Sequence, residues 1–317
     1  MIARSLFETK QFDDFFEPIT GAGLLLTQPA RIMTFNCQQH GASTVHDQYN
    51  HRPAHQKNTQ GDWAMTNPLW SGSGTTATTP GHIQQVFADI TRYINKVPNE
   101  SGWLLVGMDN VPRENWPFLF KYCKVTLTFT KNQKTYFRIL EGAHKGKTAF
   151  LSEANAKEYL GKIAPKKKPI ELVMVYGRFN DKWMSITRDR ALPQQLANGT
   201  LDGIHFEAAM NTVWDLRYSP IPPGTYSILL PDVPHAKDYT EPYKAEYPNL
   251  SHHQVWFPID HGDRSRYVHV GNVSEGCVTV VSLNRWSAIH ETLVSHRSPD
   301  GNSVGTLIVK GKPARTQ

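Results

Sequence analysis

Two residues toward the C-terminal end of this 317-residue chain, His269 and Cys277, supply groups that thiol chemistry needs. A cysteine attacks an acyl carbon as its thiolate, so it requires a base, and backbone N–H groups must stabilise the developing oxyanion. The residues between them, Val-Gly-Asn-Val-Ser-Glu-Gly (270–276), include turn formers that can point N–H groups at a ligand. Gly276 leaves space beside the thiol. The alternative interpretation is a small buried cysteine beside a structural histidine.

Three blocks of sequence bear on this choice. They are Ser-Pro-Ile-Pro-Pro-Gly-Thr-Tyr-Ser-Ile (219–228), which is followed by Pro231, Asp232 and His235; Arg-Tyr-Val-His (266–269); and Ser-Glu-Gly-Cys-Val (274–278). Together they resemble the L,D-transpeptidase catalytic domain, in which a Thr-Pro-x-Gly-x-aromatic segment precedes a histidine and a Ser-x-Gly-Cys nucleophile motif. The resemblance covers the region 169–317. It implies a mainly β (α+β) fold with a β-sandwich catalytic domain.

Three features depart from the usual motif of that family. Glu275 stands where the family has a histidine, Thr279 replaces the usual arginine or asparagine, and only four residues separate His269 from Ser274. The compact spacing resembles the branch of the family found in secreted antibacterial effectors that attack peptidoglycan. His261, at a longer spacing, is the alternative base. We expect His269 to be the base because it ends an apolar run that predicts a strand.

The resemblance implies hydrolase or transferase chemistry on the tetrapeptide stems of peptidoglycan. Cys277 would form a thioester and release D-alanine, while His269 moves the proton and the N–H groups of Gly276 and Cys277 form an oxyanion hole. Ser274 would either shape the turn or hydrogen-bond the histidine. Water would complete an L,D-carboxypeptidase reaction, and an amine would complete L,D-transpeptidation or D-amino acid exchange. A catalytically inactive peptidoglycan-binding module of the same fold is the alternative, which Glu275 favours.

The same blocks supply side chains for a substrate cleft. The resemblance implies four of them, namely Tyr226, His235, Trp256 and Arg266. Arg266 could hold a stem carboxylate, and Asp260, Asp263 or a backbone carbonyl would orient the base. Neither a cofactor nor a metal is implied, and the four histidines between residues 40 and 55 match no tight metal-ligand spacing.

Composition describes a polar, mildly basic chain. Its net charge is +6 and its isoelectric point is about 9.1, which suits an anionic partner such as a peptidoglycan stem. We find no aromatic–basic motif for nucleic acid and no apolar run near the roughly 18 residues of a membrane span. The three cysteines, Cys37, Cys123 and Cys277, do not make a disulfide framework.

The N-terminus does not show the basic and apolar pattern of a signal peptide. Because peptidoglycan lies outside the cytoplasm, we expect synthesis in the cytoplasm and secretion by a non-classical route. The protein would then act in the periplasm or cell wall of a target bacterium. The expected partners are stem peptides, a component of a secretion apparatus and an immunity protein, with neither nucleic acid nor membrane insertion.

Periodicity and turn residues predict the elements that must position the site. Residues 1–120 form an N-terminal region with a polar loop over 38–79 and a helix over 80–97, and residues 121–168 form a β-rich linker or subdomain. Hairpins are expected at 131–134 and 180–181. The catalytic domain is expected to be mainly antiparallel, with strands at 226–230, 255–259, 267–270, 278–281 and 304–310. One helix, marked by Trp286, Ile289 and Leu293 and capped by Ser282, would pack on these strands.

Overall fold

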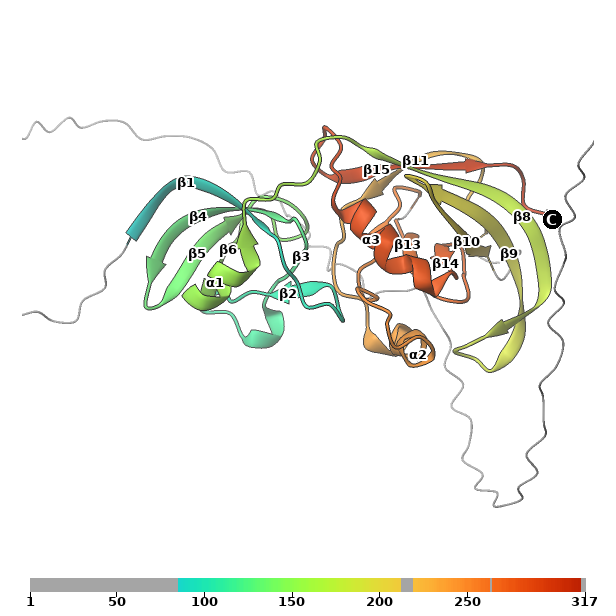
Figure 1. Ribbon diagram of the computed structural model, residues 1–317, viewed down its shortest axis with the longest axis horizontal. Coiled ribbons are helices and arrows are strands. Elements are labelled where there is room, and N and C mark those ends of the chain that lie inside the picture. The colour runs from blue at the N-terminus through green and yellow to red at the C-terminus, as the bar shows by residue number, and fades with distance from the viewer. Residues whose placement is uncertain (1–84, 212–218, 263, 315–317) are drawn as a thin grey trace, which may run out of the picture. The chain divides into compact units, whose positions relative to one another are not determined.

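The computed structural model describes residues 85–211, 219–262 and 264–314, and this part of the chain is mainly β (Figure 1). Its strands form a five-stranded, a two-stranded and an eight-stranded sheet. The predicted polar loop at 38–79, with its four histidines, lies outside the described residues.

The N-terminal described segment folds as the five-stranded sheet. In spatial order its strands are β6 (Thr148–Ser152), β5 (Lys134–Ile139), β4 (Lys124–Lys131), β1 (Gln85–Ile94) and β7 (Leu160–Gly161). The predicted hairpin at 131–134 is confirmed, because Asn132 and Gln133 join β4 to β5 with φ of 51° and 58°, as a type I′ turn requires. Helix α1 (Glu153–Tyr159) packs against β5, β6 and β7.

The helix predicted over 80–97 is wrong, because Gln85–Ile94 forms strand β1 and pairs antiparallel with β4. The apolar residues Val86, Ile90 and Ile94 recur every four positions. A spacing of four returns to the same face of a helix and to the same face of a strand. The β-branched and aromatic residues at 90–94 favour the strand, and pairing with β4 selects it.

Strand β1 also connects parts of the chain that we expected to be separate. It lies before residue 120, where we placed a boundary, yet its partner β4 lies after it, so residues 85–161 contribute to one sheet. A two-stranded sheet of β2 (Trp103–Leu105) and β3 (Phe118–Phe120) falls within this segment, as does a 3-10 turn, η1 (Arg113–Asn115). The larger sheet begins with Ile170, next to the expected boundary at 169.

The eight-stranded sheet contains all five strands predicted for the C-terminal domain. Its spatial order is β11 (Gly224–Leu229), β15 (Ser303–Lys310), β8 (Ile170–Ser185), β9 (Arg190–Leu201), β10 (Ile204–Asn211), β14 (Val278–Val280), β13 (Tyr267–Val270) and β12 (Phe257–Pro258). The sheet is mixed, because β15 runs parallel to β8 and β13 runs parallel to β14.

The hairpin predicted at 180–181 is wrong. Strand β8 continues through these residues to Ser185, and the chain reverses only before Arg190. The pairing of β8 with β9 is irregular on both sides of Asn180, whose side chain accepts the N–H of Lys182 at 2.9 Å. Asn180 and Asp181 therefore mark an irregularity inside a long strand. There the short side chain of Asn180 accepts a hydrogen bond from a nearby backbone N–H group.

The two edge strands of this sheet meet. Ile228 of β11 forms an isolated bridge with Ile259, just after β12, and the N–H of Asp260 donates to the carbonyl of Ser227 at 2.9 Å. The sheet consequently curls back on itself into a nearly closed, barrel-like arrangement. Closure of this kind covers strand edges that would otherwise be open to pairing.

The predicted C-terminal helix is confirmed as α3 (Trp286–Val294), with Trp286, Ile289 and Leu293 fully buried. Ser282 does not cap it, because a 3-10 turn, η3 (Leu283–Arg285), comes first and the Ser282 hydroxyl accepts the N–H of Glu207. The chain also forms η2 (Lys237–Tyr239) and α2 (Glu241–Glu246). Among the described residues, no helix has the length and apolar character to cross a membrane.

Ionic contacts connect α3 and the segment after it to the N-terminal segment. Glu291 accepts from Lys121 at 2.9 Å and from the hydroxyl of Tyr122 at 2.8 Å. Arg297 pairs with Glu141 at 2.8 Å, and both side chains are largely buried. Residues of both larger sheets belong to one hydrophobic core.

A stacked histidine pair lies beside these contacts. The rings of His252 and His290 are 4.3 Å apart and nearly parallel. Neither ring nitrogen of His290 has a hydrogen-bond partner in the described part of the chain. Burial lowers the pKa of His290 well below its ordinary value, with smaller contributions from His252 and Lys121, and burial lowers the pKa of His252 to about 4.

This pair predicts acid sensitivity. A histidine whose pKa is depressed in the folded state stays neutral there while the unfolded chain binds a proton. The free energy of unfolding is therefore constant above the unfolded pKa and decreases as the pH falls below about 6.5. Replacing His290 with leucine removes that loss without removing a hydrogen bond. We expect the free energy of unfolding of His290→Leu to fall by ~2 kcal/mol less than that of the wild type between pH 7 and pH 5. Urea denaturation at the two pH values measures this, and parallel losses would contradict the assignment.

Candidate functional site

The pairing of β13 with β14 places the predicted base beside the predicted nucleophile segment (Figure 1). In the parallel register His269 lies opposite Thr279, and Cys277 immediately precedes β14. Because side chains alternate along a strand, residues two apart share a face. The site is buried: 7% of His269 and 2% of Cys277 are exposed.

Hydrogen bonds fix the ring of His269. Nδ1 lies 2.8 Å from the carbonyl oxygen of Val270, and Nε2 lies 3.0 Å from the hydroxyl of Thr279. A carbonyl only accepts, so Nδ1 carries the proton and, in the neutral ring, Nε2 accepts from Thr279. Burial lowers the pKa of His269 to about 4, although the bond to Val270 acts in the opposite direction. The predicted base is therefore oriented by a backbone carbonyl, one of the three acceptors considered from the sequence.

An aromatic stack holds His269 from the side. Trp256 lies parallel to His269, with ring centroids 3.9 Å apart, and parallel to His235 at 3.7 Å. Tyr267 meets both His235 and Trp256 edge-on. His235 and Trp256, predicted to contact substrate, are 2% and 8% exposed, and Trp256 packs against the predicted base. The electron-rich indole face favours a cation above it, so the stack suits a histidine that gains a proton during a reaction.

The turn before Cys277 is held by Ser274. Its hydroxyl accepts the N–H of Gly276 at 3.1 Å and donates to the carbonyl of Cys277 at 2.7 Å. Ser274 therefore shapes the turn, which was one of its two predicted roles. The N–H of Gly276, which we expected in an oxyanion hole, is directed at this hydroxyl. Gly276 has φ of 110°, a conformation that a side chain would strain.

Two further side chains hold the same turn. The side-chain oxygen of Gln194 on β9 accepts the N–H of Ser274 at 3.0 Å. Glu275, which replaces the family's usual histidine, pairs with Arg188 at 2.8 Å. Glu275 thus anchors the turn to the segment between β8 and β9. Sequence reasoning missed Gln194 and Arg188, since neither lies in a motif and both are distant along the chain.

Arg266 connects the turn to the proline-rich block. Its guanidinium donates to the carbonyl oxygens of Ser219 and Gly276, and 6% of the residue is exposed. The resemblance implies that Arg266 lines the substrate cleft, where it could hold a stem carboxylate. In the structure it is a buried residue that positions the peptide unit next to Cys277.

Tyr226 and His261 lie together at the β11 side of the sheet. The hydroxyl of Tyr226 donates to the carbonyl of Pro222 at 2.8 Å, and its ring meets His261 edge-on at 5.2 Å. Asp260 pairs with Arg264 at 3.0 Å, and Asp263 lies outside the described residues. His261 comes before β13, whereas His269 lies on β13, paired with the strand that follows Cys277.

Asp232, which follows the proline-rich block, also lies near the aromatic stack. It lies 3.9 Å from His235 and accepts from the hydroxyl of Tyr267 at 3.4 Å. Burial raises its pKa, although hydrogen bonds from backbone N–H groups and from Tyr267 oppose the rise. Asp232 also lines a pocket of about 450 Å³ with Pro231 and Pro258. This pocket adjoins the aromatic stack.

Comparisons with known proteins do not assign this site. No protein-family model, curated protein or solved structure matches the chain.

The role of Ser274 can be tested directly. Ser274→Ala removes the acceptor of one buried backbone group and the donor of another, and each loss costs about 1–3 kcal/mol. We expect the free energy of unfolding to fall by at least ~1 kcal/mol in urea denaturation. Ser287→Ala is the control, because that exposed hydroxyl pairs with another hydroxyl, that of Ser251, and its loss should cost less than about 0.5 kcal/mol. Equal losses in the two variants would contradict the role of Ser274.

Proposed function

We propose that this chain is a cysteine-dependent enzyme that modifies the tetrapeptide stems of peptidoglycan. The observation that supports it most is the parallel pairing of β13 with β14, because it sets His269 beside Thr279, two residues beyond Cys277. The motif blocks that resemble the L,D-transpeptidase domain meet around this pairing. The buried, mainly β arrangement of these blocks is compatible with that fold.

In the proposed reaction the Cys277 thiolate attacks the carbonyl carbon at the L-centre of the diamino acid. The thiol proton passes to His269, and the imidazolium returns it to the amine of D-alanine as the C–N bond breaks. A thioester remains. Attack by water gives a carboxylic acid and restores the thiol, whereas attack by an amine gives a new amide.

Thr279 suits both protonation states of the base. Its hydroxyl donates to Nε2 of the neutral ring and can rotate to accept from Nε2–H of the imidazolium. The carbonyl of Val270 accepts from Nδ1 in both states. His269 can therefore gain and lose a proton without losing a hydrogen bond, and the indole of Trp256 favours the charged form.

We further propose that the enzyme is an antibacterial effector that reaches the periplasm or cell wall of a target bacterium. The short spacing between His269 and Ser274 supports this, since it resembles the effector branch. A secretion component and an immunity protein are the corresponding partners.

A binding module without catalysis is the second candidate. The 2% exposure of Cys277 favours it, as does the engagement of both His269 nitrogens in hydrogen bonds. Glu275 also favours it, because its pairing with Arg188 gives it a purely structural role.

Muropeptide analysis separates the two candidates. Tetrapeptide-rich sacculi treated with the wild type should yield tripeptides, exchanged stems or new cross-links, detected by mass spectrometry. Cys277→Ala should lower the rate by at least about a thousandfold. Cys123→Ala is the matched control: that thiol is fully buried, burial raises its pKa, and its loss should leave the rate within about twofold.

Unchanged stems with both wild type and Cys277→Ala would contradict the enzyme. If both proteins still bound sacculi, the binding module would be supported instead. Absence of binding as well would overturn both candidates.

The pH profile tests which histidine is the base. A pKa of about 4 leaves His269 neutral, and able to accept a proton, above about pH 5. We expect kcat/KM for D-alanine release to be constant from pH 7 to about pH 5 and to fall by half near pH 4. His261→Gln should retain this profile and His269→Gln should abolish activity. A midpoint near 6.5 that disappears in His261→Gln would reverse the assignment.

A further inference from the structure

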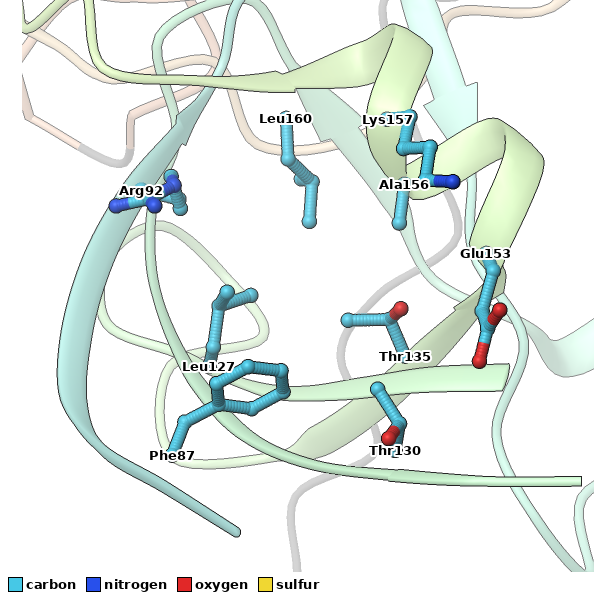
Figure 2. Close-up of a pocket in the computed structure, with 9 residues that line it drawn as sticks. All are labelled: Phe87, Arg92, Leu127, Thr130, Thr135, Glu153, Ala156, Lys157 and Leu160. Carbon is cyan, nitrogen blue, oxygen red and sulfur yellow. The ribbon is translucent and has the colours of Figure 1, made fainter. Parts of the chain in front are cut away.

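The five-stranded sheet carries a pocket that the proposed reaction does not use. Its volume is about 360 Å³, and residues of β1, β4, β5, α1 and β7 line it. Figure 2 shows their side chains around an open space, with β1 on one side and α1 on the other. The size lies within the usual range of ligand pockets.

Apolar side chains form much of the lining. Phe87 of β1, Leu127 of β4 and Leu160 of β7 contribute to it from three neighbouring strands. In Figure 2, Leu127 and Phe87 lie together across the open space from Leu160 and Ala156. A side chain of the size of leucine or valine could bury its surface here, which contributes about 1.5–3 kcal/mol.

The strand beside the pocket has an incomplete edge. β7 pairs with β1 only at Tyr93 and Ile94, so Val86–Arg92 have no strand neighbour on that side within the described ranges. Val86 is 74% exposed. An open edge next to a side-chain pocket is the arrangement that binds peptides by strand addition, with main-chain hydrogen bonds for affinity and the pocket for specificity.

The charged residues that line the pocket indicate which kind of peptide would bind there. Arg92 and Lys157 line the pocket, and neither forms an ion pair with an acidic side chain of the described residues. Glu153, one helical turn before Lys157, is the one acidic residue of the lining. Two cations against one anion favour a ligand with a carboxylate.

We propose that β1 and this pocket bind an extended segment of another protein that carries an apolar and an acidic side chain two positions apart. The segment adds as a strand to the open edge of β1. Because residues i and i+2 of a strand share a face and lie about 7 Å apart, the apolar side chain enters the pocket while the carboxylate reaches Arg92 or Lys157. This site is separate from Cys277 and does not depend on the proposed catalysis.

Selection from a phage-displayed library of random heptapeptides tests the proposal. The full chain carrying Cys277→Ala serves as bait, so that thiol chemistry cannot contribute. We expect enrichment of sequences with an apolar residue two positions from aspartate or glutamate. Titration calorimetry should then show that Arg92→Glu with Lys157→Glu weakens the selected peptide at least about tenfold, and that added salt weakens its binding to the bait.

Two controls keep the outcome decisive. Lys145→Glu with Lys167→Glu makes the same change in net charge at exposed positions outside the pocket, and should leave affinity within twofold. Ala156→Phe fills the pocket without changing charge and should also weaken binding, with circular dichroism verifying its fold. The proposal is overturned if no acidic–apolar pattern is enriched, or if the selected peptides bind the charge-reversed pair as well as they bind the bait.

Discussion

Strands β13 and β14 are parallel neighbours joined by only seven residues, since β13 ends at Val270 and β14 begins at Val278. Parallel neighbours ordinarily need a connection of a dozen or more residues, because the chain must travel back along the first strand before the second begins. Seven residues reach at most about 25 Å when fully extended. The connection must therefore return almost directly, and the geometry around Cys277 follows from this constraint.

A return this short requires both an unusual backbone and fixed anchors. Gly276 supplies the backbone with its φ of 110°, and Ser274 closes the last turn through two hydrogen bonds. The long β8–β9 pair supplies anchors at the other side. Trp183 of β8 donates to the carbonyl of Asn272 at 2.8 Å, and Gln194 of β9 accepts from Ser274. The length of β8, which continued past the predicted hairpin, is thus what lets it reach this connection.

The sequence predicted the parts of the fold that depend on local pattern. Alternation and turn residues located the C-terminal strands, α3 and the hairpin at Asn132 and Gln133. The failures occurred where local patterns were ambiguous or overlooked. The four-residue spacing in β1 fits both the helical period and the strand period. The turn at Asp202 and Gly203 joins β9 to β10 with φ of 46° and 78°. This pair was a hairpin signal in the sequence that we did not use.

The residues of the candidate site can be proposed from the sequence, but their hydrogen-bond partners cannot. The family motif indicated His269 and Cys277 as the candidate base and nucleophile. Thr279 was noted because it differs from the residue that the family usually has at that position. Only the parallel register shows that Thr279 faces His269. A single sequence does not predict pairings between distant segments, such as that of Arg188 with Glu275. Each of these side chains alone resembles an ordinary solvated charge.

Near Cys277, the buried group that carries a positive charge is Arg266, because His269 is neutral in the resting state. Burial keeps the pKa of His269 near 4, so the resting imidazole is neutral and cannot itself stabilise a thiolate as a cation. The buried guanidinium of Arg266 donates to two carbonyl oxygens, that of Gly276, which directly precedes Cys277, and that of Ser219. Carbonyl dipoles solvate this charge without cancelling it, whereas the carboxylate of Glu141 neutralises Arg297. In the proposed reaction, a cation that no carboxylate of the described residues neutralises would favour a thiolate near it. In the reaction that we propose, the neutral histidine only has to accept a proton, while Arg266 holds the turn and supplies the electrostatic field.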